Sequence, residues 1–138
     1  MSLNELLEKV RNRGGRITKT RIAILDYLLS AKQPLSSTEI INHLRNASLI
    51  VNRTTVYREL AYLVGNGFVR EVKLLGKTVL FELSEEHRHH LVCLKCHQVK
   101  TLAANHELCQ QEAIIRQEDG FKVLDHSLEF YGLCKKCQ

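Results

Sequence analysis

The stretch Val51-Asn-Arg-Thr-Thr-Val-Tyr-Arg-Glu-Leu-Ala-Tyr-Leu-Val64 has the spacing of an amphipathic helix. One face is apolar and consists of Val56, Leu60, Leu63 and Val64. The opposite face carries basic and hydrogen-bonding side chains, namely Arg53, Thr54, Thr55, Tyr57 and Arg58. In the DNA major groove, arginine pairs with base-edge acceptors, apolar or aromatic groups contact thymine methyls, and hydroxyl groups reach phosphates. The pattern therefore predicts a recognition helix with these residues as candidate DNA contacts.

Three more helices are predicted upstream of this stretch. Residues 3–10 repeat apolar side chains at helical spacing and stop at Gly14-Gly15, whose backbone freedom breaks a helix. Thr18 is suited to cap a second helix. The apolar stripe of that helix is predicted to be Ile22, Leu25, Leu28 and Leu29. The motif Ser36-Ser-Thr-Glu39 is a capping box that starts a third helix, which runs to about residue 44.

A β-hairpin is predicted directly after the recognition helix. The segments 68–74 and 78–83 flank Leu75-Gly76-Lys77, which has the composition of a turn. Helices followed by a hairpin are the order of a winged helix-turn-helix domain, here residues 1–83. Helix order alone leaves an alternative, a small helical domain that binds protein and has Tyr57 and Arg58 as solvated surface residues, because fold does not by itself establish function.

The positive charge of the chain lies in this first part. Residues 1–83 hold 13 Lys and Arg against 7 Asp and Glu, whereas residues 84–138 hold 7 against 8. Such a balance suits the phosphates of double-stranded DNA, although a solvated basic face would have the same composition. No apolar run approaches the roughly 20 residues of a membrane span, and residues 1–5 lack a secretory pattern. We therefore expect a cytoplasmic protein with no membrane partner.

Two Cys-x-x-Cys pairs, separated by 37 residues, lie in the second part of the chain. They are Cys93-Leu-Lys-Cys96 and Cys134-Lys-Lys-Cys137. Each pair can direct two thiolates at one ion, and two pairs complete the tetrahedral four-sulfur shell of a structural Zn²⁺. Two alternatives fit this chain less well: paired disulfides suit exported proteins, and a redox-active pair needs a βαβ context that is absent here.

Residues 84–138 are predicted to form a small α/β domain around these pairs. A strand leads to Cys93, a helix runs from Asn105 to roughly Glu118, and a strand spans Phe121 to Tyr131. On that last strand, one face is predicted to hold Leu124, His126, Leu128 and Phe130. The histidine at position 126 is therefore expected to point inward.

Histidines and the fifth cysteine indicate a second metal site. Alternation along the strand before Cys93 places His87 and His89 on one face and Arg88 and His90 on the other. A tetrahedral shell can be drawn from His87, His89, Cys109 and His126. These borderline-soft ligands favour Zn²⁺, with Fe²⁺ or Co²⁺ as alternatives. The competing interpretations are a core histidine at position 126 and a small buried apolar cysteine at position 109.

Together these features resemble the ferric uptake regulator (Fur) superfamily, whose members sense iron, zinc, manganese, nickel or peroxide. The matching motifs are Arg16-Ile-Thr18 with Arg21, Thr55-Val-Tyr-Arg58, Phe81-Glu-Leu83, the cluster from His87 to His90, Cys93-x-x-Cys96, His126-Ser-Leu and Cys134-x-x-Cys137. The resemblance implies a homodimeric repressor that binds metal, sets the angle between its two winged helices and grips an AT-rich palindromic operator. It also implies that Tyr57 and Arg58 contact bases in the major groove and that Arg16 reaches the minor groove.

Two departures from the family pattern concern the sensing metal. Pro34 and Arg88 stand where the family's usual interdomain site has histidines, so only Glu82 and His90 remain there. The resemblance implies that a second family site maps onto His87, His89, Cys109 and His126, with cysteine replacing a carboxylate. A thiolate in the shell favours zinc sensing, leaves iron sensing open with Mn²⁺ as a further candidate, and disfavours peroxide sensing. The glycine that usually follows the first cysteine pair is here His97.

The sequence therefore predicts an α+β protein with a winged-helix DNA-binding domain, residues 1–83, and a metal-binding dimerisation domain, residues 84–138. No catalytic constellation is visible in it. Two alternatives to a metal-responsive repressor remain. One is a metal-independent winged-helix regulator that has only the structural zinc, and the other is a thiol- or metal-buffering enzyme that uses the basic half as a scaffold.

Overall fold

The computed structural model describes residues 1–31, 33–74, 78–84, 88–103, 106–124 and 126–138, with the side chains of all these except 103 and 106–109. The chain divides into two compact units, Met1–Glu85 and Glu86–Gln138. Each unit is a body with its own sheet. Within the described ranges, no helix has the length and apolar content needed to cross a membrane.

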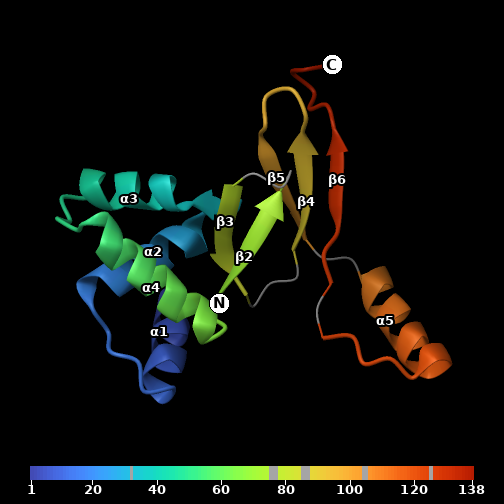
Figure 1. Ribbon diagram of the computed structural model, residues 1–138, viewed down its shortest axis with the longest axis horizontal. Helices are drawn as coiled ribbons and strands as arrows, with labels where there is room; N and C mark the ends of the chain where they lie inside the picture. Colours follow the sequence, from blue (N-terminus) through green and yellow to red (C-terminus); the bar gives the residue numbers. More distant parts are fainter. Residues whose placement is uncertain (32, 75–77, 85–87, 104–105, 125) are drawn as a thin grey trace. The chain divides into compact units, whose positions relative to one another are not determined.

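Four helices make up most of the described part of the first unit (Figure 1): α1 (Leu3–Asn12), α2 (Lys19–Ser30), α3 (Ser37–Asn46) and α4 (Arg53–Gly65). Side-chain caps set where all four begin, and the sequence predicts the caps of α2 and α3. Thr18 accepts a hydrogen bond from the backbone N–H of Arg21 at the start of α2. Ser36 and Glu39 form both bonds of the capping box at α3. The predicted starts of these helices are confirmed.

A three-stranded antiparallel sheet completes the first unit. β2 (Val69–Leu74) and β3 (Thr78–Leu83) form the predicted hairpin, whose turn at 75–77 lies outside the described residues. β1 (Leu35–Ser36) pairs with the other edge of β3, which gives the order β1-β3-β2. β1 is not predicted from the sequence, since two residues are too few to show alternation. Helices followed by this hairpin confirm the winged-helix prediction.

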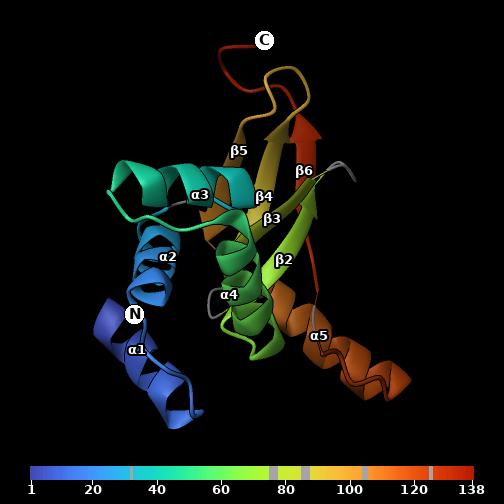
Figure 2. The same ribbon diagram turned by 60° about the vertical axis from the view of Figure 1, so that its left-hand side comes forward.

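The core of the first unit is one apolar cluster contributed by all four helices and the sheet (Figure 2). Its fully buried members include Leu6, Val10, Ile24, Leu25, Ile40, Leu44, Val56, Leu60, Leu63, Val69 and Leu83. α2 departs from prediction because Ile22 and Leu29 are only half-buried. Its buried stripe is instead Arg21, Ile24, Leu25 and Leu28, in which a charged residue takes an apolar position.

The described part of the second unit consists of a three-stranded sheet and one helix. β4 (Arg88–Cys93) is central, antiparallel to β5 (Val99–Ala103) and parallel to β6 (Glu129–Gly132). α5 (His106–Asp119) lies between β5 and β6 in the chain. Figures 1 and 2 both place it beyond the end of this sheet that is opposite the β4–β5 turn. The predicted α+β class is confirmed.

Two strands of this unit differ from those predicted from the sequence. The strand predicted over residues 121–131 is regular only at Glu129–Gly132, where it pairs with β4. Leu124 is 85% exposed and Phe130 50%, so the inward face predicted for residues 124–130 is wrong at these two positions, whereas His126 and Leu128 are half-buried. β5 is not predicted at all, because its short sequence has no clear alternation of apolar and polar residues.

Candidate metal centre and nucleic-acid interface

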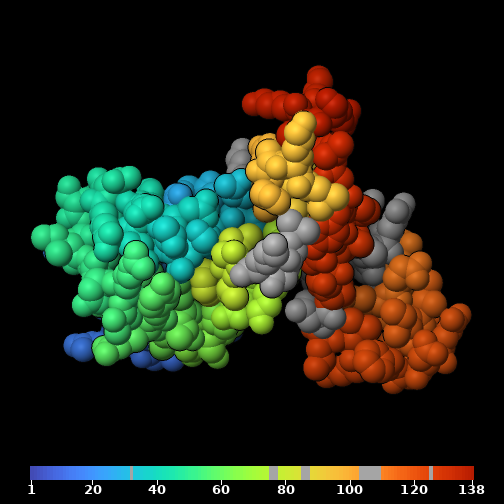
Figure 3. All heavy atoms as spheres, turned by 45° about the horizontal axis from the view of Figure 1, so that its top comes forward, coloured from blue at the N-terminus to red at the C-terminus, as the bar shows by residue number. Residues whose placement is uncertain are grey.

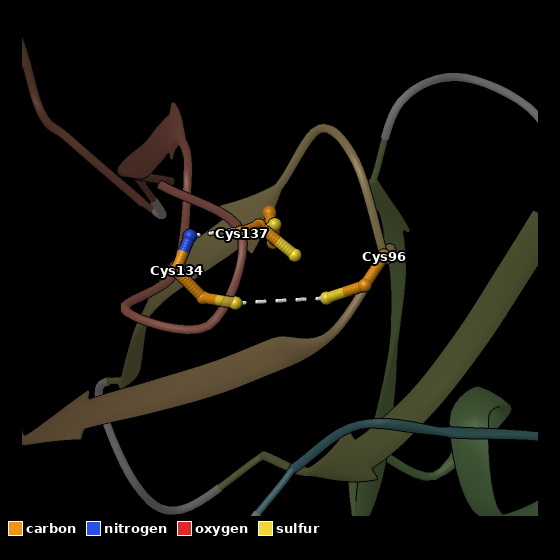
Figure 4. Close-up of side chains that lie close together, drawn as sticks. Cys96, Cys134 and Cys137 are labelled. Atoms are coloured by element: carbon orange, nitrogen blue, oxygen red, sulfur yellow. Dashed lines mark hydrogen bonds between the residues drawn. The ribbon is translucent and has the colours of Figure 1, made fainter.

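Four cysteines meet where β4 turns into β5. Cys93 and Cys96 come from that turn, and Cys134 and Cys137 follow β6, which runs parallel to β4 and ends beside it. Their ligand atoms all lie within 4.8 Å of one another, and Sγ of Cys96 is 3.7 Å from Sγ of Cys134 (Figure 4). A tetrahedral ion with Zn–S bonds of about 2.3 Å requires sulfurs about 3.8 Å apart. The cluster therefore fits a closed zinc site.

Hydrogen bonds shift the pKa values of two of these thiols in opposite directions. Backbone groups of Cys96 and then Cys134 hydrogen-bond to Cys93 and lower its pKa to about 5, which makes this sulfur a thiolate at neutral pH. The hydrogen bond to the Cys134 side chain is the main cause that raises the pKa of Cys137 to about 12. A divalent cation would have to displace that proton, so zinc affinity should fall as the pH falls.

His97 follows the first cysteine pair with a φ of 60°, in the left-handed region. Its backbone N–H donates to the carbonyl of Cys93 at 2.9 Å and closes the turn. Replacing His97 with glycine is expected to raise the free energy of unfolding by up to about 1 kcal/mol, because glycine adopts this conformation without steric cost.

Urea denaturation of the zinc-loaded protein measures the effect of this change. His97→Ala is the matched control, since alanine loses the imidazole but keeps the Cβ that causes the strain. A glycine variant less stable than the alanine variant would contradict the argument from strain.

A second group of metal-type ligands lies elsewhere in the second unit. His89 on β4 is 5% exposed, and its ring centre is 5.8 Å from that of His126, which precedes β6. Nδ1 of His126 is 2.6 Å from Oε1 of Glu112 on α5. Two imidazoles and a carboxylate from three separate segments are thereby brought together.

Glu112 is absent from the ligands predicted by sequence. It lies three residues after Cys109, so helical spacing places the two positions on neighbouring turns of one face of α5. This spacing is the signal that could have found it. His87 and the side chain of Cys109, the other two predicted ligands, lie outside the described part of the structure.

The remaining candidates, Glu82 and His90, belong to different units. Glu82 on β3 is 2% exposed, and its Oε1 lies 2.7 Å from Nε and 2.6 Å from Nη2 of Arg70, its cross-strand partner on β2. This guanidinium neutralises the Glu82 carboxylate within the first unit. His90 is buried on β4, at the position that pairs with Glu129 of β6.

The predicted DNA contacts lie on the outer side of α4. Arg53, Thr54, Tyr57 and Arg58 are all exposed, with Tyr57 at 48%. Thr55 is half-buried, and its hydroxyl donates to Oδ1 of the N-cap residue Asn52 at 2.9 Å, so it belongs to the helix cap. In Figure 3, α3 and α4 (cyan to green) form one continuous surface. Arg16 is also exposed, in the loop between α1 and α2.

Known proteins share these features of sequence. The model of the ferric uptake regulator family matches residues 12–131. The ferric uptake regulation protein of Legionella pneumophila is 34% identical over 133 residues, which cover 95% of this chain and 97% of that protein. The peroxide-responsive repressor PerR of Staphylococcus saprophyticus is 29% identical over 136 residues, which cover 99% of this chain and 91% of that protein.

The fold has a similar counterpart among solved structures. The ferric uptake regulator from Pseudomonas aeruginosa with manganese superimposes with a TM-score of 0.78 at 28% identity, over 98% of this chain and 99% of that one. The family model, the full-length relatives and the winged helix followed by a four-cysteine unit all agree. The chain belongs to the ferric uptake regulator family of metal-responsive transcriptional regulators.

Proposed function

We propose that this chain is a homodimeric repressor that binds an AT-rich palindromic operator in double-stranded DNA. The observation that carries the proposal is the exposed face of α4, which presents Arg53, Thr54, Tyr57 and Arg58 on a basic winged helix. Guanidinium groups on such a face can pair with guanine bases, and hydroxyl groups can reach phosphates. Residues 1–83 would hold the DNA, and residues 84–138 would bind metal and dimerise.

Uncovered apolar surface on the second unit supports dimerisation. None of residues 110–119 of α5 is buried, and helices of this length are marginal without packing. Exposed large apolar residues of this unit include Leu102, Ile114, Phe121, Leu124, Phe130, Tyr131 and Leu133. A second copy of the chain is the occupant we propose, because two-fold dimers match operators built from two half-sites.

Two metal sites are proposed in the second unit. A structural Zn²⁺ is held by Cys93, Cys96, Cys134 and Cys137. A regulatory divalent metal, Zn²⁺ or Fe²⁺ with Mn²⁺ as a further candidate, is held by His87, His89, Cys109 and His126. Glu112 joins the second set because its carboxylate already reaches His126. A cation bound there would supply positive charge that these ligands share. If the cation binds the DNA-competent form of the protein more tightly than the other form, DNA affinity rises by that same ratio of affinities.

The metal content of the purified chain tests the second site. Protein stripped by mild chelation and reloaded with Zn²⁺ or Fe²⁺ is measured by elemental analysis. We expect two metals per wild-type chain and one in His126→Ala, because the four cysteines keep theirs. Cys109→Ala and Glu112→Ala then show which side chain completes the shell, since loss of a ligand lowers occupancy. One metal per chain in the wild type would contradict the second site.

A metal-independent regulator is the second candidate function. It is supported by Pro34 and Arg88 at expected histidine positions and by the Arg70 guanidinium on Glu82. Operator binding by protein with zinc only at the cysteines distinguishes the two candidates. A gain of about tenfold on full loading, or about 1.4 kcal/mol, supports a metal switch, whereas equal affinity supports the alternative. In either case we propose that the chain acts in the cytoplasm, where its operator would lie.

A further inference from the structure

Arg21 is a charged residue in the buried stripe of α2. It is 6% exposed, and its Nε donates to Oε2 of Glu59 on α4 at 2.7 Å while its Nη2 lies 3.3 Å from Oε1 of the same carboxylate. Its guanidinium carbon is 3.9 Å from the ring centre of Tyr62. Its Nη1 donates to the backbone carbonyl of Arg16. One side chain therefore joins the loop before α2 to helix α4.

Other contacts fix the same loop against the end of α4. Gly15 packs so closely that a Cβ there would lie 2.4 Å from the hydroxyl oxygen of Tyr62. The guanidinium of Arg13 lies over the ring of Phe68, 4.8 Å from its centre, and donates to the carbonyl of Asn66. These contacts at Arg13 and Gly15 hold the loop directly before Arg16, whose carbonyl the buried guanidinium binds.

Stability alone does not require a buried guanidinium at this position. Replacing a buried ion pair with well-packed apolar groups is often neutral or stabilising. The contacts of Arg21 have a geometric consequence instead. The carbonyl it holds belongs to the exposed Arg16, and the carboxylate it holds belongs to Glu59, which directly follows the exposed Arg58. The same guanidinium therefore sets the separation between two candidate DNA contacts.

We infer that Arg21 is a positioning residue for DNA recognition, holding the Arg16 arm at a fixed distance from the base-reading face of α4. The inference rests on the proposed function. One winged helix then meets the major groove and a flanking A·T-rich minor groove together. A narrow A·T minor groove attracts arginine, and an arm ordered before binding avoids the entropy of ordering it on DNA. Arg21 acts through Arg16 and does not touch DNA, because it is buried.

A double-mutant cycle tests this role. Arg21→Met keeps an apolar chain of similar length but removes the bonds to Glu59 and to the Arg16 carbonyl. Affinity is measured by fluorescence anisotropy with and without Arg16→Ala, on a duplex of about 30 bp, long enough for two half-sites, selected from a random pool by the zinc-loaded wild type. A second duplex has its flanking A·T pairs changed to G·C. Arg70→Met, which breaks the ion pair with Glu82 on the hairpin, is the matched control.

We expect Arg21→Met to weaken binding about tenfold when Arg16 is present and less than about twofold in the Arg16→Ala background. Arg21→Met should also lose the preference for A·T flanks, whereas Arg70→Met should keep it. If Arg21→Met does not fold, as judged by its melting temperature, Glu59→Ala, which removes the carboxylate that anchors Arg21 to α4, must give the same pattern. Equal losses in both backgrounds, or no loss in either, overturn the positioning role.

Failure of the proposed function looks different from failure of this inference. If the wild type selects no duplex, or Arg58→Ala binds the selected duplex as tightly as the wild type, the function and the inference both fall. If the wild type selects a duplex that Arg58→Ala no longer binds, and the cycle is additive, only the role of Arg21 is overturned.

Discussion

Replacing Cys96 with serine is expected to remove the zinc of the four-cysteine cluster and to unfold the second unit. Among the described residues of this unit, the only buried hydrophobic ones are Val92 and Cys93. Small domains with little core depend on a metal or a partner for stability. Structural zinc in zinc-finger peptides binds with about 10–16 kcal/mol, as much as the whole stability of a typical domain, about 5–15 kcal/mol.

Zinc content, sedimentation and circular dichroism measure this outcome. Cys96→Ser should lose one zinc per chain, lose the dimer and lower the melting temperature of its second unit by at least about 10 °C. The first unit should keep its helices, because its core cluster is drawn entirely from residues 3–83. Lys135→Ala, on the same turn as Cys134 and Cys137 but exposed, is the matched control and should behave as the wild type. A serine variant that kept both zinc and dimer would contradict a structural role for the cluster.

The features predicted correctly from sequence are those encoded over short distances. Thr18 and the pair Ser36 and Glu39 start helices through bonds to backbone groups three residues away. The apolar face of α4 follows from helical spacing, and the hairpin follows from its turn composition. The four cysteines could be assigned to one zinc site because two Cys-x-x-Cys pairs in one chain are typical of such a site.

The features that sequence does not show depend on contacts between distant segments. β1 exists only because Leu35 pairs with Phe81 of β3. The buried position of Arg21 depends on Glu59, 38 residues later, so helical periodicity alone assigns that stripe position wrongly. In each case the missing information is the identity of a partner, which the local pattern does not contain.

The apolar residues of the second unit are a related case. Sequence periodicity treats Leu124 and Phe130 as inward-facing, yet the single chain leaves both exposed. A pattern of apolar residues indicates burial without saying whether the covering surface belongs to the same chain. If these residues pack against a second copy, as we propose, the expectation of burial applies to the dimer. For the single chain, the prediction is wrong at both positions.

Arg58→Ala is expected to weaken operator binding by about 30-fold or more per dimer, because a bidentate pair to a base contributes about 1–3 kcal/mol and each half-site would lose one. Arg58 is exposed on α4 beside Tyr57, and the neighbouring Glu59 is held by Arg21. The guanidinium is therefore presented from a helix that is fixed on the domain. Fluorescence anisotropy with the selected duplex and with a scrambled duplex measures affinity and specificity.

The matched control is Arg45→Ala, which removes an equal charge from the exposed last turn of α3. A variant that loses only one phosphate contact per protomer should weaken both duplexes alike and reduce the slope of log K against log salt by about 1.8 for the dimer. Arg58→Ala should instead weaken binding to the selected duplex far more than binding to the scrambled one. The zinc content of this variant should remain unchanged, because the cysteines that would hold zinc lie in the second unit. Equal weakening on both duplexes would mean that Arg58 contacts phosphates and does not read bases. Unchanged binding would favour the alternative in which the first unit binds protein.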